Sequence, residues 1–366
     1  MTGLPSALRG TQRTSLTRGR STAWRSRRVV LTAGALCLLV ASILAATSIG
    51  VVAIGPGQTA RILLAHFGAP IDVATSAAMH DTIIWEVRFP RVLLAGVVGA
   101  ALSGSGATYQ AVFRNPLADP YLIGVASGAA LGASIAILSP LPVDFYGVGY
   151  VALFAFVGAM LAVGLTYELA HVGRTVPPVA HVLAGVAVSA AAGAGTSLLM
   201  TLSNDRLLLI FAWIFGDFST ASWTKFWAIM PYAGVAFLVL IATSRHLNVL
   251  QLGDEEAQAL GVPVQRVKVV SIVTASLAAA AAVAVAGVIG FVGLVVPHAC
   301  RMLAGPDHRV LLPLSMLGGA ILLIWADLAA RTVIAPQELP VGVLTACLGA
   351  PFFMLLLRRQ RRMDAS

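Results

Sequence analysis

The 366-residue chain is 58% hydrophobic and only 11% charged, and its mean hydropathy is +0.89. Soluble domains carry about 25% charged residues, so this composition excludes a soluble protein and places most of the surface in lipid. The net charge of +9 does not indicate a nucleic-acid partner. Its basic residues flank apolar runs, where they orient a membrane protein and contact anionic headgroups.

Basic segments lie at both ends of the chain. Seven arginines fall between Arg9 and Arg28, no acidic residue precedes Asp72, and four more arginines follow within 358–362. The apolar run 29–54 is longer than the core of a signal peptide, and no clear cleavage site follows it, so it is interpreted as a retained first helix. We expect residues 1–28 and 358–366 to be basic cytoplasmic tails, the first of them disordered.

Long apolar segments fill the chain between these tails. A transmembrane helix needs about 20 apolar residues, and by this measure the sequence predicts an all-α polytopic membrane protein with about ten transmembrane helices within 29–357. The predicted spans are 29–54, 92–112, 120–139, 147–169, 179–202, 226–243, 269–287, 288–303, 310–326 and 341–357. The stretch 269–303 is divided in two because the basic residues at its ends, Lys268 and Arg301, both belong on the inner side.

The orientation follows from the basic residues between the spans. Roughly three-quarters of the 24 Lys and Arg residues fall on one side of this topology, which the positive-inside rule makes the cytoplasm. We therefore expect a multi-pass protein of the bacterial cytoplasmic (inner) membrane with both termini cytoplasmic.

Small residues recur at helical spacing inside several spans. Helices in lipid approach closely where such residues line their contacts. The clearest series are Gly96, Gly99, Ser103, Gly104 and Gly106, and then Gly124, Gly128 and Gly132. A tightly packed bundle is predicted rather than a wide, water-filled pore.

Four long motifs resemble the FecCD family of ABC importer permeases, which serve iron-siderophore, heme and cobalamin uptake. They are RFPRVLLAGVVGAALSGSGATYQAVFRNPLADPYLIGVASGA (88–129), LNVLQLGDEEAQALGVPVQRVK (247–268), GVIGFVGLVVPHACRMLAGPDHRVLLPLSMLGGA (287–320) and ADLAARTVIAPQELPVGVLTACLGAPFFMLLL (326–357). The resemblance implies the type II ABC importer permease fold and a homodimer with the translocation path at its axis. It also implies two ATP-binding subunits on the cytoplasmic face and an extracytoplasmic substrate-binding protein. This chain would then bind no cofactor and no metal, and the partner ATPase would use ATP and Mg.

The segment 251–263 resembles the coupling helices of the family, which sit in a cleft of the ATPase. A helix gripped by a moving partner should be short, polar and exposed, and here Gly261 and Pro263 end the unit. The alternative is an ordinary solvated loop. The residues assigned to coupling are Leu252, Gly253, Asp254, Glu255, Glu256, Ala257, Leu260 and Gly261.

Three outer arginines stand at positions where the family engages acidic residues of the binding protein. They are Arg88, Arg91 and Arg331, and guanidinium groups suit this role because they pair bidentately with carboxylates. The alternative is that they snorkel to the interface or pair within the chain, with Glu86, Asp327 or Glu338.

Residues 204–218 are a candidate lining of the translocation path. Their candidate contact residues are Arg206, Phe211, Trp213 and Phe215. Aromatic rings and an arginine suit heme, a catecholate siderophore or a corrin ring about equally, with iron chelates slightly favoured. The alternative is a short, packed re-entrant helix.

Other mechanisms fit the sequence less well. A P-loop needs a lysine after glycine, but the only lysines, Lys225 and Lys268, follow threonine and valine, so this chain is not an ATPase. An ion-gradient-driven secondary transporter usually buries ionisable groups within its spans, and these spans are nearly free of charge. For an intramembrane enzyme, the least favoured alternative, no His-Ser dyad, zinc-type His-Glu-x-x-His or pair of mid-span aspartates is evident.

Overall fold

The computed structural model describes residues 8–70, 78–140, 144–145, 148–171, 178–203 and 205–364, and the regular secondary structure in this part of the chain is helical apart from one very short strand pair. The helices are α1 (Leu8–Ser48), α2 (Pro56–His66), α3 (Ala78–Thr82), the π-helical turn η2 (Ile83–Arg88), α4 (Phe89–Val112), the 3₁₀ turn η3 (Pro120–Ile123), α5 (Val125–Leu138), α6 (Tyr150–Leu169), α7 (Pro178–Leu202), α8 (Leu207–Phe215), α9 (Trp223–Leu250), α10 (Asp254–Ala259), α11 (Val264–Ala286), α12 (Val292–Ala304), α13 (His308–Thr332) and α14 (Val341–Asp364). Strands β1 (Asp144–Phe145) and β2 (Val148–Gly149) are antiparallel, with Asp144 opposite Gly149.

Each predicted span coincides with a helix, but not all of these helices are long. Seven are long and apolar enough to cross a membrane, among them a continuous 35-residue helical stretch from Ala78 to Val112. Three are shorter apolar helices, Val125–Leu138, Val292–Ala304 and Val341–Leu355. A 13-residue helix such as α12 is about 20 Å long, short of the roughly 30 Å hydrocarbon core. The all-α polytopic class is confirmed, and the count of ten is approximate.

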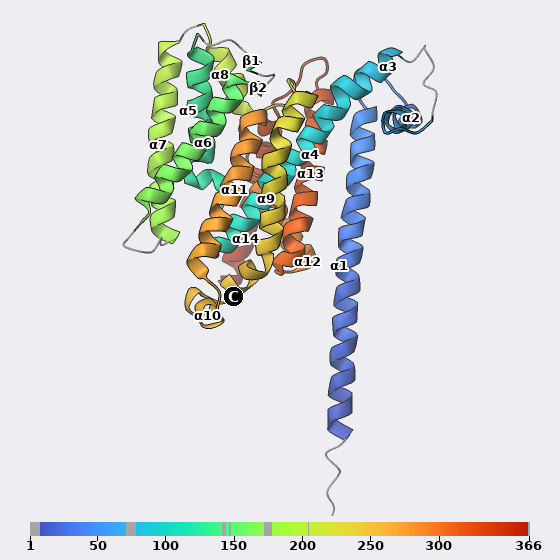
Figure 1. Cartoon of the computed structure of the whole chain (residues 1–366), viewed down its shortest axis with the longest axis vertical. Coiled ribbons are helices and arrows are strands. Elements are labelled where there is room, and N and C mark those ends of the chain that lie inside the picture. The colour runs from blue at the N-terminus through green and yellow to red at the C-terminus, as the bar shows by residue number, and fades with distance from the viewer. Residues whose placement is uncertain are drawn as a thin grey trace, which may run out of the picture.

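The two predicted tails differ from what the structure shows. The described chain is helical from Leu8, where the 41-residue helix α1 begins, so residues 8–28 are not the disordered tail that the sequence indicated. Residues 358–364 likewise continue α14, while residues 1–7 and 365–366 lie outside the described residues. In Figure 1, α1 stands beside the bundle and extends beyond it at the end where α10 and the C terminus lie.

Local sequence signals account for where several helices begin and end. Asp307 caps α13 by accepting a hydrogen bond from the Arg309 amide, and Ser222 caps α9 in the same way. Helix α11 ends at Gly287, which adopts φ +72°, a conformation that favours glycine. The stretch predicted to turn within 269–303 therefore does turn, between α11 and α12.

Helix α4 runs through the centre of the bundle (Figure 1), where it contacts α9, α11, α12 and α13. A Cβ atom at Gly99 would overlap the carbonyl oxygen of Gly319 in α13, and one at Gly319 would overlap the Gly99 carbonyl. Nearer the C-terminal end of α4, Gly106 lies just as close to the Gly293 carbonyl of α12. The first predicted series of small residues is confirmed as a close contact, because only glycine lets these backbones touch.

The second series forms a similar contact between α5 and α6. A Cβ at Gly128 would overlap the carbonyl of Gly158, and one at Gly132 would overlap the carbonyl of Phe154. Helices α5, α6, α7 and α8 form a group beside the α4-centred helices in Figure 1. The two glycine series thus join the helices within two adjoining parts of one bundle.

The α4–α13 contact makes a stability prediction. We expect Gly99→Ala to lower the thermal unfolding temperature of the detergent-purified protein, because the backbones must separate, at a cost of about 1–3 kcal/mol. The matched control is Gly164→Ala in α6, where a Cβ meets nothing within 4 Å and the helix gains from alanine. Equal unfolding temperatures for the two variants would contradict the packing argument.

Candidate functional site

The segment between α9 and α11 folds as a short helix between two glycine turns. Helix α10 has six residues, Gly253 before it has φ +136°, and Gly261 after it has φ +81°. Both φ values lie in a region of backbone conformation that residues other than glycine rarely adopt. Pro263 then precedes the first residue of α11, so the predicted order of helix, glycine break and proline restart is what the structure contains.

Three contacts fix α10 to the bundle. Asp254 pairs with Lys268 of α11 at 2.5 Å and with Arg114, beyond the end of α4, at 3.4 Å. Ala257 is fully buried. The Gln251 side chain donates a hydrogen bond to the Ala111 carbonyl of α4 at 2.9 Å. The segment is therefore attached to α4, α9 and α11 together.

The solvent-exposed side of the α10 segment carries both apolar and acidic side chains. Leu252 and Leu260 are 62% and 65% exposed, and Glu255 and Glu256 are exposed between them. Figure 1 places α10 at the foot of the bundle, beside the C terminus. Two exposed leucines that flank carboxylates on a firmly anchored helix offer a small docking surface to a partner.

A polar network that the sequence did not reveal lies at the same end of the bundle. Asp307 accepts hydrogen bonds from Asn248 of α9 at 2.6 Å and from Arg28 of α1 at 2.5 Å, and the Asn248 amide oxygen accepts one from the His308 backbone at 2.8 Å. Partial burial raises the pKa of Asp307, but the hydrogen bonds from Arg309, Asn248 and Arg28 outweigh it and hold that pKa well below the usual range. The ionised carboxylate joins α1, α9 and α13.

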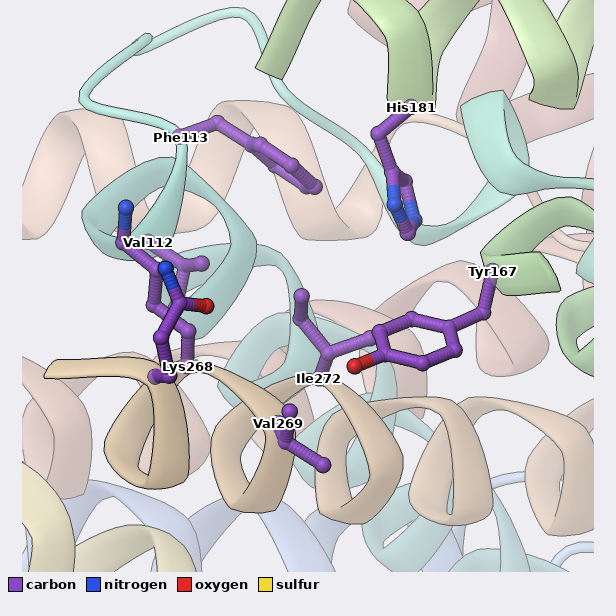
Figure 2. A pocket seen from close by; sticks show the side chains of 8 residues that line it. Val112, Phe113, Tyr167, His181, Lys268, Val269 and Ile272 are labelled. Carbon is purple, nitrogen blue, oxygen red and sulfur yellow. The ribbon is translucent and has the colours of Figure 1, made fainter. Parts of the chain in front are cut away.

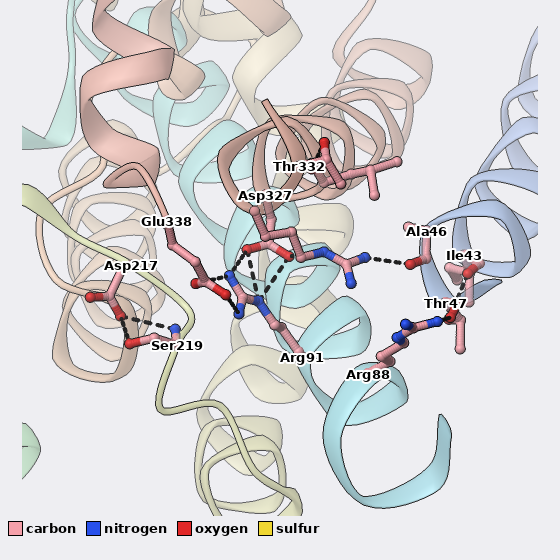
Figure 3. Close-up of polar contacts among 12 residues, drawn as sticks. Ile43, Ala46, Thr47, Arg88, Arg91, Asp217, Ser219, Asp327, Thr332 and Glu338 are labelled. Carbon is pink, nitrogen blue, oxygen red and sulfur yellow. Dashed lines mark hydrogen bonds and ion pairs between the residues drawn. The ribbon is translucent and has the colours of Figure 1, made fainter. Parts of the chain in front are cut away.

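At the opposite end of the bundle, all three outer arginines are buried. Figure 3 shows Arg88 and Arg91 there, with Asp327 and Glu338 beside Arg91. Arg88 donates to the carbonyls of Ser48 and Val52, at 2.9 and 2.6 Å. Arg331 donates to the carbonyl of Ala46 and lies 3.6 Å from Asp327. Two of the three arginines thus bond backbone carbonyls at the end of α1 or in the segment after it.

Arg91 occupies the centre of this outer arginine cluster. Its guanidinium donates to both oxygens of Asp327, at 2.8–3.1 Å, and to both oxygens of Glu338, at 3.1 and 2.9 Å. The Asp327 side chain is almost completely buried, whereas that of Glu338 is 41% exposed. Pairing within the chain, the alternative considered for these arginines, is the arrangement that the structure has, with Asp327 and Glu338 as the acids.

The residues proposed to line a path are divided between two faces of α8. Trp213 lines a cavity of about 640 Å³ whose walls are mostly apolar and whose polar lining includes Asp217, Ser219 and Lys225. Phe211 and Phe215 are exposed, and their rings stack with centroids 6.2 Å apart. 

Arg206, just before α8, donates to the carbonyls of Ile137 and Ser139, while Asn204 lies outside the described residues. The structure thus gathers Trp213 into a cavity and leaves Phe211 and Phe215 on an open surface. It does not bring all four candidates to one site.

Comparisons with known proteins agree with this architecture. The sequence model of the FecCD transport family matches residues 38–359. The chain is 42% identical to the hemin transport system permease protein HmuU of Yersinia pestis, over 79% of this chain and 87% of that one. It is 39% identical to the cobalamin import system permease protein BtuC of Halobacterium salinarum, over 91% and 97%.

A solved structure points the same way. It is described as a metal-chelate type ABC transporter in an inward-facing conformation, and it superposes with a TM-score of 0.77 at 31% identity, covering 90% of this chain and 98% of its own. The family match over most of the chain and these long alignments together show that the chain belongs to the FecCD transport family.

Proposed function

We propose that this chain works as a homodimeric permease that imports an iron chelate, a ferric siderophore or heme, or else cobalamin. As a FecCD family member it is a transport subunit and not an enzyme. Two ATP-binding subunits on the cytoplasmic face would supply the energy from ATP and Mg, and an extracytoplasmic binding protein would deliver the cargo. The ion-gradient-driven alternative is not favoured, since relatives along most of the chain are named as permeases of import systems.

The observation that carries the proposal is the geometry of the segment around α10. A helix that receives force from an ATPase must expose a docking surface and yet be held firmly by its own subunit. Leu252, Leu260 and the carboxylates between them provide the surface, while Asp254 and Ala257 provide the attachment. This segment would lie in the cytoplasm, with both chain ends on the same side of the cytoplasmic membrane.

The translocation path is proposed to run along α8 at the axis between two subunits. Phe211 and Phe215 are exposed in the single subunit, and in a homodimer these stacked rings would face the axis. A path lined by few charged residues does not bind a large ligand tightly, so the ligand can pass through it without a slow release step. Hemin and cobalamin, named for the relatives HmuU and BtuC, are both large enough to require such a path.

The coupling role predicts a specific loss on changing the two exposed leucines. We expect Leu252→Asp combined with Leu260→Asp to weaken copurification of the ATPase and ATP-driven uptake at least about tenfold, because each buried leucine contributes about 1.5–3 kcal/mol. Thermal stability should not change, since both side chains are exposed. The control replaces both leucines with methionine, which stays apolar; if the aspartate variant held the ATPase as well as this control, the docking surface would lie elsewhere.

If Arg91 docks the binding protein, removing the charge of Glu338, the exposed ion-pair partner of Arg91, should change the affinity for the binding protein. An incoming carboxylate would have to displace Glu338 from the guanidinium, so Glu338→Gln should strengthen capture of the binding protein several-fold, measured by biolayer interferometry on permease in nanodiscs. Glu86→Gln is the control, because it removes an exposed outer charge, whereas the ion-pair partners of Arg91 in the described part of the chain are Asp327 and Glu338. Capture that is unchanged or weaker in Glu338→Gln would leave these arginines with a purely structural role.

The cargo is identified by direct transport. The permease, its ATPase and its binding protein are reconstituted in liposomes, and uptake of heme, ferric siderophores and cobalamin is followed with and without ATP. We expect ATP-dependent uptake of one of the three classes. Uptake that persists without the ATPase, driven by an ion gradient, would overturn the proposed function.

A further inference from the structure

His181 is a buried polar side chain that the proposed function has not used. It lies in the first turn of α7 and its surface is fully buried. Neither ring nitrogen has a hydrogen-bond partner among the described residues. Its neighbours there are aromatic: the Phe113 ring centroid is 5.3 Å away, and that of Tyr167 is 6.2 Å away. A buried polar group without a partner is costly, and native structures rarely leave one.

A small pocket lies directly beside the imidazole (Figure 2). Its volume is about 20 Å³, and a single water molecule needs about 10–15 Å³ on this measure. Besides apolar side chains, Tyr167, Gln265 and Lys268 line it. Figure 2 shows the imidazole pointing down between Phe113 and Tyr167 towards α11. The pocket therefore has the size and the polar groups to hold one water, and it has no room for a larger ligand.

The charges around the pocket favour a neutral occupant. Lys268 brings a positive charge, but its ammonium group is paired with Asp254 at 2.5 Å. The nearby His181 bonds equally well to a water in either tautomer, because water both donates and accepts. An anion would have to compete with Asp254 for the same ammonium. Water is therefore the occupant that the geometry selects.

The pocket also has a particular place in the fold. It lies between the ends of α4 and α6 and the beginnings of α7 and α11. Helix α11 follows the α10 segment directly, and Lys268 ties the two together. A movement of α10 thus reaches one wall of the pocket at once, and His181 stands on the opposite wall, on the helix that precedes α8.

We propose that His181 and one bound water form a polar bridge from α7 to α11, and that this bridge carries motion of the α10 segment to α7. His181 is then a positioning residue for energy coupling. This inference rests on the proposed importer function, whereas the water site itself does not. A water-mediated contact suits two helices that move relative to each other. Its hydrogen bonds can break and re-form more readily than tightly packed apolar side chains can repack.

The first test is structural. The transporter, assembled with its ATPase in nanodiscs, is solved by electron cryomicroscopy at a resolution that shows ordered water. We expect one density peak in this pocket within hydrogen-bonding distance of an imidazole nitrogen of His181. A pocket with no density, or an imidazole bonded directly to a protein group, would overturn the bridge.

The second test uses three variants of α7 in the same complex. We expect His181→Leu to lower both the unfolding temperature and the amount of cargo moved per ATP, the latter about twofold or more, and His181→Gln to restore both, since its amide can bond the water. Thr196→Val is the control, because among the described residues that buried hydroxyl bonds only the Ala192 carbonyl of its own helix. If His181 were merely an unpaired core residue, leucine would leave the protein as stable as before or more so.

The outcomes separate the two levels of the proposal. If the wild-type complex hydrolyses no ATP and moves no cargo, the importer function fails, while the water density and the unfolding temperatures still decide the site. If transport is normal and His181→Leu moves as much cargo per ATP as the wild type, the importer stands and the bridge is wrong.

Discussion

The arrangement of this bundle depends on backbone contact along α4. Gly99 against Gly319 and Gly106 against Gly293 bring α13 and α12 so close that no side chain fits between them. Two side-chain hydrogen bonds then fix the rotation of α4 about its own axis. Ser105 donates to the Ala275 carbonyl of α11 at 2.8 Å, and Gln110 donates to the Gly293 carbonyl at 3.1 Å. In lipid there is no hydrophobic force between helices, so such close packing and hydrogen bonding hold them together. A helix held on several sides moves as one piece with its neighbours.

This central helix also connects the two ends of the molecule. Arg88 and Arg91 stand at its N-terminal end, and the Ala111 carbonyl that holds the α10 segment stands near its C-terminal end. The outer cluster is stable because every guanidinium has partners; removing one member of a buried pair costs about 3–5 kcal/mol. The α10 segment, held at the C-terminal end of α4, instead leaves Leu252 and Leu260 exposed. At the N-terminal end of α4 the arginines are therefore paired within one chain, with Glu338 as the exposed partner, while the α10 segment at the other end presents exposed leucines to a second protein.

The sequence predicted what depends on local pattern and missed what depends on three-dimensional neighbours. Hydropathy located a helix at each predicted span, and the spacing of Gly99 and Gly128 located two helix contacts, because periodicity and residue size are local properties. The glycine break at Gly261 after α10 was also predicted from the sequence. The length of the apolar stretch 288–303 did not show that α12 is only 13 residues long. Apolar residues also fill loops that are buried between helices, so an apolar stretch can be longer than its helix. The carbonyl partners of Arg88 and the unpartnered ring of His181 had no signal, because such partners come from helices distant in sequence.

Helix α11 explains how force applied at one face can act near the other without a special pathway. Its 23 residues span about 34 Å at 1.5 Å per residue. The part from Lys268, which binds Asp254, to Ala286, which lines the cavity beside Trp213, spans about 27 Å. At its far end Gly287 packs against Gly216, the residue that ends α8, so closely that a Cβ would meet the Trp213 carbonyl. A tilt of α11 at the α10 segment must therefore displace the end of α8. The Lys268–Asp254 ion pair at one end of α11 and the Gly287–Gly216 contact at the other allow little relative movement. Under the proposed function, a partner that moves α10 would therefore change the surface that α8 presents.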